Sequence, residues 1–346
     1  MPFPKRLSAS CQQVIREALD GLPSEAKITV RSCLGDSDLQ PIVMNHKCNG
    51  CILTPSSLYS DMVNTVAGYL YRKYEGNSGS PGINITDLQV HKPLLVKAAS
   101  NIAQLFIEMD VSASNKAPAN LHIAEVTLQC SFHSTTSEGV RLQEMGHCQA
   151  TFQDCQTWIN NWSHSTSTIL GRMDSLHIAA VKANDDRVRL VQRDKAYKMF
   201  ESFVQYGPKY QNMSEVIFDT KTLEATSTVD FPHIDHSNDP TGPYYMDAFC
   251  HLSGFVCNAV EKDKAKFAYI NGGVGSIKLS HKFQRANTGS VIRNYVQMRP
   301  LPNDNTTLQG DVFVLQDDEI VGVWEQVRFK RIPRRVLDIF LPPPKK

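Results

Sequence analysis

The most distinctive arrangement of apolar and polar positions in this chain lies at residues 243–260, with the sequence PYYMDAFCHLSGFVCNAV. The apolar positions recur at helical spacing and predict a buried stripe: Met246, Phe249, Val256 and Val260. A second set shares one narrow polar face of the same helix: Asp247, His251, Gly254 and Asn258. Such a face is either the solvent side of an amphipathic helix or, on a helix buried on most sides, a strip that is hydrogen-bonded or lines a cavity. Because the other faces are nearly all apolar, we treat Asp247 as a candidate site residue.

A second long helix is predicted from Pro55 to Arg72, because proline suits the first turn of a helix and apolar side chains follow it at helical spacing. About four segments typical of strands follow each of the two helices. After the first helix they are 94–96, 103–110, 121–130 and 145–152, and after the second 274–281, 291–298, 307–315 and 320–329. Asp317-Asp318 predicts the hairpin turn between the last two strands.

The remaining segments are assigned in the same way. We expect helices at 8–22, 154–176 and 195–206, and strands at 26–34, 215–219 and 224–229. Residues 41–53 predict a loop with Asn49-Gly50 as its turn. The Gly-rich run 271–276 predicts a turn rather than a phosphate-binding loop, because it precedes a strand and lacks the lysine of a P-loop.

The order of elements therefore repeats, with one long central helix and then strands in each half of the chain. This plan predicts an α+β protein with a double hot-dog fold, in which two antiparallel sheets each wrap around a long central helix, although a generic α+β chain of two domains has the same order. We expect an N-terminal hot-dog at 12–158, a linking helix and linker at 159–187, a C-terminal hot-dog at 188–336 and a linker stub at 337–346.

Composition narrows the function classes. The 346 residues are 41% hydrophobic, which suffices for one large domain or two ordinary ones. A net charge of +1 gives no electrostatic footprint for nucleic acid, and no apolar run approaches the ~20 residues of a membrane span. The chain starts without the apolar core of a secretion signal, and its nine cysteines, an odd number, are read as reduced thiols. We therefore expect a cytoplasmic protein that binds neither nucleic acid nor membrane.

Asp247 needs a partner if it takes part in acid–base chemistry, and histidine has the pKa that suits a general base near neutral pH. Among the eleven histidines, His46 stands out because it lies just before the first central helix, as Asp247 lies just inside the second. A carboxylate beside an imidazole orients it and stabilises its protonated form. From spacing alone, this pair is one of many His–Asp pairs that can be drawn.

Three motifs carry a resemblance to a known family. NHKCNGCILTPSSLYSDM at 45–62 and PYYMDAFCHLSGFVCNA at 243–259 resemble the two signature motifs, GH-x-V-x-G…P-x-S-x-Y-x-D and D-(A/S)-x-x-H-x-(A/S)-G-F-x-x-N, of the product template domain of fungal non-reducing polyketide synthases. ATFQDCQTWINNW at 150–162 resembles the connector between them. The resemblance covers about residues 11–341, in the family's order. The sequence departs from it at Asn45, where glycine is usual, and at Cys48 and Cys51, where aliphatic residues are common.

The resemblance implies a dehydratase-type double hot-dog that receives a poly-β-ketone as a thioester on the phosphopantetheine arm of an acyl carrier protein. Such a domain directs regioselective aldol cyclisation and then dehydration to an aromatic ring, and the wording of the motifs favours closure of carbon 2 on carbon 7. Carried over by position, His46 is the catalytic base and Asp247 its partner. The substrate-binding candidates are His251, Asn258, Cys250 and Gly254. The resemblance implies no metal or other cofactor bound by the domain itself, other synthase domains as partners, and a homodimer.

Other interpretations stay open. A dehydratase acting on a β-hydroxyacyl thioester would use the same dyad on a reduced chain, and a non-catalytic acyl-binding hot-dog would use neither residue. Cys48-Asn-Gly-Cys51 invites a zinc or redox site, but no second pair of cysteines has the spacing of a zinc knuckle and no thioredoxin-like pattern surrounds it. A basic run near the C-terminus is either solvated surface or a docking surface for an acidic carrier protein: Arg328, Lys330, Arg331, Arg334 and Arg335.

Overall fold

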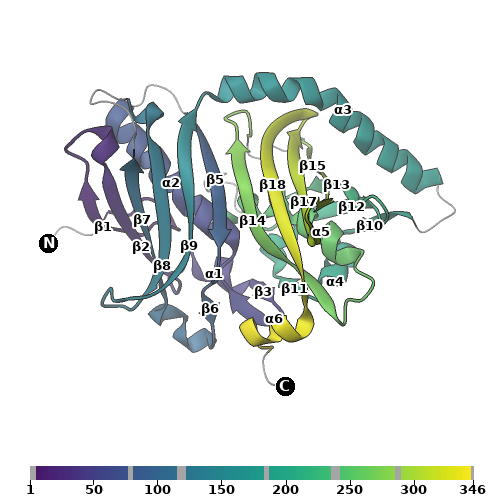
Figure 1. Ribbon diagram of the computed structural model, residues 1–346, viewed down its shortest axis with the longest axis horizontal. Coiled ribbons are helices and arrows are strands. Elements are labelled where there is room, and N and C mark those ends of the chain that lie inside the picture. Colours follow the sequence, from purple (N-terminus) through teal and green to yellow (C-terminus); the bar gives the residue numbers. More distant parts are fainter. Residues whose placement is uncertain are drawn as a thin grey trace. The chain divides into compact units, whose positions relative to one another are not determined.

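The computed structural model describes residues 5–76, 81–114, 122–182, 187–234, 242–284 and 290–343 (Figure 1). The chain divides into two compact units. The first consists of Met1–Met44, Ile52–Cys155 and Thr241–Pro243, and the second of Asn45–Cys51, Gln156–Pro240 and Tyr244–Lys346. Compared with the domain boundaries expected from the sequence, the short segment Asn45–Cys51, which carries His46, lies with the second half of the chain.

The first unit is an antiparallel sheet with a long helix. Its strands run in the order β1 (Gln13–Ala18), β2 (Lys27–Cys33), β7 (Phe106–Ser114), β8 (Thr127–Thr135), β9 (Arg141–Gln153) and β5 (Gly82–Val90). Helix α2 (Ser56–Glu75) packs against β5 and β8, and its apolar side chains are buried, as predicted. The smaller elements are α1 (Gln40–Met44), three 3₁₀ turns (Pro23–Glu25, Ala99–Gln104 and Ile123–Glu125), and β4 (Cys51–Leu53), which pairs with β6 (Leu95–Val96).

The second unit repeats this plan with more strands. Its antiparallel sheet runs in the order β14 (Phe267–Leu279), β18 (Glu319–Pro333), β17 (Asp304–Gln316), β15 (Ile292–Gln297), β13 (Glu224–Val229), β12 (Met213–Asp219) and β10 (Val188–Gln192). Its helices are α3 (Cys155–Lys182, counted with this unit from Gln156), α4 (Arg193–Phe200), α5 (Pro243–Ala259) and α6 (Arg334–Phe340). The short pieces are β3 (His46–Cys48), which pairs with β11 (Val204–Tyr206), β16 (Arg299–Leu301) beside β17, and a 3₁₀ turn at Pro208–Tyr210.

Helix α5 is the buried centre of the second unit. Met246, Phe249 and Val256, three members of the predicted stripe, are each at most 2% exposed. Their neighbours Leu252 and Phe255 are also fully buried, so the helix is covered on most sides. A helix that apolar draws its stability from packing rather than from its own hydrogen bonds. The prediction of one long central helix followed by antiparallel strands is confirmed in each unit.

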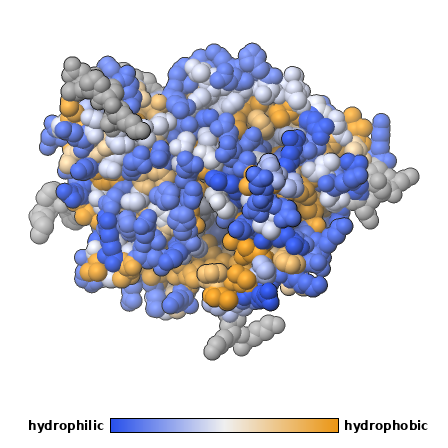
Figure 2. Space-filling view, in the orientation of Figure 1, coloured by the Kyte–Doolittle hydropathy of each residue, from blue (hydrophilic) through white to orange (hydrophobic). Residues whose placement is uncertain are grey.

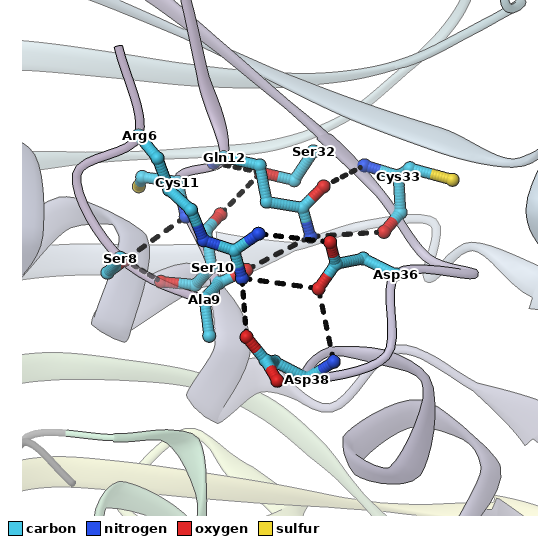
Figure 3. Close-up of polar contacts among 10 residues, drawn as sticks. All are labelled: Arg6, Ser8, Ala9, Ser10, Cys11, Gln12, Ser32, Cys33, Asp36 and Asp38. Atoms are coloured by element: carbon cyan, nitrogen blue, oxygen red, sulfur yellow. Dashed lines mark hydrogen bonds and ion pairs between the residues drawn. The ribbon is translucent and has the colours of Figure 1, made fainter.

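The predicted helix at 8–22 is wrong, because residues 13–18 form the edge strand β1. Figure 3 shows the polar contacts that hold the segment before it against the end of β2. The Gln12 side chain donates to the carbonyls of Ala9 and Cys33 and accepts from the Cys33 N–H, and Ser32 donates to the Ser10 carbonyl. These contacts align the chain with β2, so ladder hydrogen bonds outweigh the short helical pattern.

Two further predictions need correction. The helix expected at 195–206 ends at Phe200, and the last three residues of that range are strand β11, because they pair with β3. The Gly-rich run at 271–276 is not a turn but part of the long strand β14. A β-bulge between Asn271 and Gly273 interrupts its pairing with β18, and Gly273 takes a φ of 112°, a value that glycine adopts without strain.

The termini of the predicted segments differ in smaller ways. The helix expected at 154–176 is confirmed as α3 and runs on to Lys182. The loop expected at 41–53 contains α1, β3 and β4, but its Asn49-Gly50 turn is confirmed by φ values of 51° and 79°. The linker stub expected at 337–346 is wrong in its first part, because Leu337 lies in α6 and is 2% exposed.

Two properties of the whole chain bear on its environment. In the part of the chain that the structure describes, no helix is long and apolar enough to cross a lipid bilayer. All nine cysteines lie among the described residues, and each is a free thiol.

Candidate active site

The polar strip on α5 begins with a close contact between a carboxylate and an imidazole. Asp247 Oδ2 lies 2.6 Å from His251 Nε2, one helical turn further along, and the two side chains are 11% and 3% exposed. A carboxylate oxygen and an unprotonated ring nitrogen are both hydrogen-bond acceptors. The contact is therefore an ion pair when the imidazole is protonated.

The other ring nitrogen of His251 faces a tyrosine from α4. Tyr197 Oη lies 3.4 Å from His251 Nδ1, donates a hydrogen bond to the Tyr210 carbonyl at 3.0 Å and accepts one from the Met213 N–H at 3.1 Å. The hydroxyl is thus fixed by the backbone of the segment that leads into β12. On the side away from Asp247, the His251 ring therefore contacts the hydrogen-bonded Tyr197 hydroxyl rather than solvent.

His46 lies on β3 and is 7% exposed. Its ring packs edge-on against two tyrosine rings, with centroid distances of 5.5 Å to Tyr206 and 5.7 Å to Tyr210. Tyr206 is placed there because it is the direct partner of His46 in the ladder between β3 and β11. The imidazole therefore sits in an aromatic wall, a low-dielectric setting in which electrostatic interactions are stronger than in water.

Tyr206 connects the two halves of the site. Its ring contacts the His46 ring on one side and the His251 ring on the other, the latter at a centroid distance of 4.2 Å. The Asp247 carboxylate also acts on the groups around His46. Burial, with this charge as the second cause, raises the pKa of Tyr206 and Tyr210 well above the usual range and that of Cys48 to about 12. The structure thus brings His46 and the Asp247–His251 pair to the same aromatic cluster in the second unit.

The other three residues expected to bind substrate have packing roles in the structure. Asn258 donates to the carbonyls of Gly254 and Tyr269 and accepts from the Tyr269 N–H, so its amide ties α5 to β14. A Cβ on Gly254 would lie 3.0 Å from Cζ of Phe329, so glycine lets β18 approach the helix closely. Burial raises the pKa of the Cys250 thiol to about 12, which leaves it protonated at neutral pH. Their contact with a substrate stays a prediction.

Sequence reasoning missed the tyrosines, although they form most of the wall. Tyr206 and Tyr210 come from β11 and the 3₁₀ turn after it, and Tyr197 from α4. The available signal was Gly207-Pro208, a dipeptide that marks a turn and is flanked by Tyr206 and Tyr210. The three tyrosines gather because β11 pairs with β3, a contact that local spacing does not encode.

The alternative centres find no support in the geometry. Among the described residues, no three His, Cys, Asp or Glu side chains gather in a way that could hold a metal ion. Burial raises the pKa of both Cys48 and Cys51, so neither is an activated thiolate. A cavity of about 280 Å³ lies elsewhere, between α3 and the strands β12, β13 and β15. Its walls include Asp174 and Arg293 but none of the residues above.

Comparison with known proteins gives a consistent result. Residues 179–338 match the family model described as the polyketide synthase dehydratase N-terminal domain. The chain is 36% identical over 343 residues to non-reducing polyketide synthase PKS1 of Zymoseptoria tritici and 33% identical over 341 residues to the conidial yellow pigment biosynthesis polyketide synthase of Emericella nidulans. These alignments cover 99% and 98% of this chain but only 15% of each relative, so the chain corresponds to one segment of such enzymes.

Solved structures agree on the fold. The dehydratase domain from the CurJ module of the curacin polyketide synthase superposes with a TM-score of 0.65 at 8% identity, over 95% of this chain and 99% of that one. The expected double hot-dog fold is thereby confirmed, and so is the resemblance to a domain of non-reducing polyketide synthases. Along its whole length the chain is similar to one segment of non-reducing polyketide synthases, and its residues 179–338 match the model of a polyketide synthase dehydratase domain.

Proposed function

We propose that this domain directs the aldol cyclisation and aromatising dehydration of a poly-β-keto thioester, with His46 as the general base and Asp247 as its partner. The observation that carries the proposal is the convergence of His46 and the Asp247–His251 pair on the Tyr206 ring. The names of the matched synthases support the substrate class. A synthase that does not reduce its ketones produces a chain whose carbonyls alternate with acidic methylenes.

The first step is proton abstraction. A methylene between two carbonyls is acidic enough for a neutral imidazole, and a positioned base contributes about 10²–10⁴-fold to such a step. His46 takes the proton, the enolate carbon attacks a distant ketone carbon, and the new alkoxide takes a proton back. Loss of that hydroxyl as water then gives the aromatic ring. Asp247 stabilises the protonated imidazole electrostatically through the shared low-dielectric cluster.

The tyrosines supply the second element of the mechanism. Because burial and the Asp247 charge raise their pKa, Tyr206 and Tyr210 stay protonated at neutral pH. A protonated phenol in a dry site can donate a hydrogen bond to the oxygen of an enolate, where negative charge develops. The flat rings also suit a chain of planar enols. Holding one enolate beside one ketone suppresses the competing cyclisations.

The proposal extends to the partners. We propose that an acyl carrier protein delivers the chain on its phosphopantetheine arm, that the other domains of a synthase act before and after this one, and that the assembly is a homodimer in the cytoplasm. The proton transfers need no metal or redox cofactor bound by the domain. Which carbons are joined, with carbon 2 to carbon 7 as the expectation, is decided by the product.

A reconstitution tests the proposal. The loading, condensing and acyltransferase domains and the carrier protein of the parent synthase are combined with the intact chain, with no chain, or with His46→Ala, and the products are identified by mass spectrometry. A matched control is His177→Ala, because His177 is an exposed histidine on α3 outside the site. We expect the intact chain and the control to channel a mixture of spontaneous pyrones into one aromatic compound, and His46→Ala to lose this effect.

The dehydratase alternative has a specific observation in its favour, since the matched family model and the similar solved structures are dehydratases. The same protein offered a β-hydroxyacyl thioester on the carrier protein would then form the α,β-unsaturated product at a His46-dependent rate. Identical products in all arms of the reconstitution would contradict the cyclase, and His46-dependent dehydration of the reduced thioester would establish the alternative.

A further inference from the structure

We propose that Asn49, Arg334 and Asp338 form a clasp that positions His46, so that helix α6 sets the geometry of the catalytic base from outside the active site. The inference rests on the proposed role of His46 and adds residues that touch neither the substrate nor the reacting atoms. They are positioning residues. All three belong to the second unit.

The strand that carries His46 is too short to hold itself. β3 has three residues and pairs with the equally short β11. Both belong to a small sheet in which no strand is longer than three residues, and strands this short hold their place weakly without further contacts. Backbone hydrogen bonds extend the pairing by one step at each end, from the Gly207 N–H to the Asn45 carbonyl at 2.8 Å and from the Asn49 N–H to the Phe203 carbonyl at 2.7 Å. Side chains add further contacts at the Asn49 end.

The Asn49 side chain is the attachment point at the far end. Its Nδ2 donates to Asp338 Oδ1 and to the Leu341 carbonyl, both at 2.8 Å, and its Oδ1 accepts from Arg334 at 3.4 Å. Arg334 and Asp338 are one turn apart on α6, so this helix binds both the nitrogen and the oxygen of the amide. Asn49 also has a φ of 51°, a conformation that asparagine tolerates better than most residues.

Arg334 holds both strands at once. Its guanidinium donates to the Ser202 carbonyl, just before β11, at 2.6 Å and to the Lys264 carbonyl at 3.1 Å, in addition to Asn49. Burial lowers the pKa of this arginine, although its side chain stays partly exposed. Two residues of the predicted basic run thus make contacts within the fold, since Arg331 pairs with Glu261. In Figure 1, α6 lies directly beside β3 and β11.

The clasp acts on His46 through the ladder. His46 is three residues from Asn49, or about 10 Å along an extended strand. The opposite end of β3 allows little compensation, because a Cβ on Gly207 would lie 2.0 Å from Asn45 Oδ1, so the chains are already in close contact there. If the Asn49 end is released, β3 tilts about the Asn45 end and the imidazole moves. A displacement near 1 Å can cost about 10²-fold in rate.

The decisive variants remove the side chain without straining the backbone. Asn49→Gly keeps the left-handed turn and deletes the amide, and Asp338→Ala deletes the acceptor on α6. We expect each to lower kcat for cyclisation by about tenfold or more while KM stays within twofold, because the substrate contacts are intact. Asp338→Asn still offers an oxygen to Asn49 Nδ2 and should recover most of the rate. Ile339→Ala changes a side chain on the same helix that is 75% exposed, so this variant is the matched control and should match the wild type.

A spectroscopic measurement makes the test independent of activity. In protein labelled with ¹⁵N-histidine, the imidazole signals of His46 are assigned by their absence in His46→Ala. We expect Asn49→Gly and Asp338→Ala to shift these signals and to move their titration midpoint. The signals of the other ten of the eleven histidines should stay unchanged. Circular dichroism confirms that the variants are folded. A purely structural role would alter thermal stability but leave the His46 titration in the folded protein as it was.

The outcomes separate the clasp from the proposed function. If His46→Ala abolishes cyclisation but Asn49→Gly and Asp338→Ala match the wild type in kcat and in the His46 spectrum, the clasp is overturned and the proposed function stands. If His46→Ala has no effect on the products, the proposed function fails, and a changed His46 spectrum in the two variants still supports the clasp as a device that positions this side chain.

Discussion

The two central helices, α2 and α5, have the same place in their units but put a buried carboxylate to different uses. On α2, Asp61 is 5% exposed and accepts a short hydrogen bond of 2.5 Å from the Ser10 hydroxyl. On α5, Asp247 lies 2.6 Å from the His251 imidazole, beside an aromatic cluster that includes His46. Each carboxylate also raises the pKa of a buried thiol, Cys11 in the first unit and Cys48 in the second, where burial is the larger cause.

The difference lies in the partners. A serine hydroxyl cannot accept or release a proton near neutral pH, so the Asp61–Ser10 contact can only fix the N-terminal segment to the helix. An imidazole titrates in that range, and a second imidazole stands across Tyr206. Two helices of one architecture thus carry one carboxylate with a structural contact and one that we propose to be catalytic, and only the neighbouring side chains tell them apart.

The largest expected effect separates the two carboxylates by activity. Asp247→Asn keeps the shape of the side chain but removes its charge, so we expect the rate of cyclised product formation to fall by about 10²–10⁴-fold. Asp61→Asn, the matched variant on α2, can still accept from Ser10 and should stay within a few-fold of the wild type. Rates are measured in the reconstituted system with protein whose fold is verified by circular dichroism. An equal loss of rate in both variants would contradict the different roles of Asp247 and Asp61.

The second expected effect concerns stability, and here the change at the Asp61–Ser10 contact matters rather than the change at Asp247. Ser10→Ala removes a donor from a buried carboxylate, which should lower the free energy of unfolding by about 1–3 kcal/mol, whereas activity per folded molecule is unchanged. Replacing both partners, in Ser10→Ala with Asp61→Leu, should recover part of the loss, since no charged group is then left buried. Urea unfolding followed by fluorescence measures both variants. A single variant as stable as the wild type would show that the contact contributes nothing.

The sequence was sufficient for the features that depend on local spacing. The Pro243 helix, the Glu224–Val229 strand and the Asn49-Gly50 and Asp317-Asp318 turns are all present, because periodicity and turn chemistry specify them directly. The edge strand Gln13–Ala18 and strand β11 were missed for one shared reason. Each is made a strand by a partner distant in sequence, β2 and β3 respectively, and a short amphipathic segment fits a helix equally well.

The candidate site divides in the same way. Asp247 and His46 were found from a polar strip and from motif positions, and the imidazole beside Asp247 lies on the same helix, where spacing could have revealed the contact. The tyrosines could not be found so easily, because their convergence depends on the pairing of β11 with β3. The contacts of Arg334 were equally hidden, since a run of basic residues looks like solvated surface until the fold shows which member binds backbone carbonyls.

Helix α6 also carries apolar side chains whose exposure could not be read from the sequence. Ile339 and Phe340 are 75% and 68% exposed, although they follow the buried Leu337 by only two and three residues. Figure 2 shows apolar surface at the position of α6 on this face of the molecule. The same short helix therefore grips the Asn49 turn with one side and presents apolar side chains to solvent with the other.

The smallest expected effect tests whether the field of Asp247 reaches the surroundings of His46. A pKa of about 12 means that the Cys48 thiolate is scarce at pH 8.5, where an ordinary thiol is about half ionised. Asp247→Asn removes one cause of that raised pKa, so a larger fraction of Cys48 is thiolate at any fixed pH and its alkylation by iodoacetamide should be a few-fold faster. Peptide mass spectrometry measures the labelling at residue 48.

The same shift has a consequence for stability, and its sign is definite. The folded protein keeps the Cys48 proton between about pH 8.5 and pH 12, whereas the unfolded chain releases it, so this group contributes stability that is lost as the pH rises through that range. Asp247→Asn should make the total loss smaller, because the folded pKa then lies nearer the unfolded value, and Asp61→Asn should leave the Cys48 alkylation rate unchanged because its neighbour is Cys11. Equal Cys48 labelling in the wild type and in Asp247→Asn would mean that the carboxylate acts only on His251. The partnership with His46 would then lose its electrostatic basis.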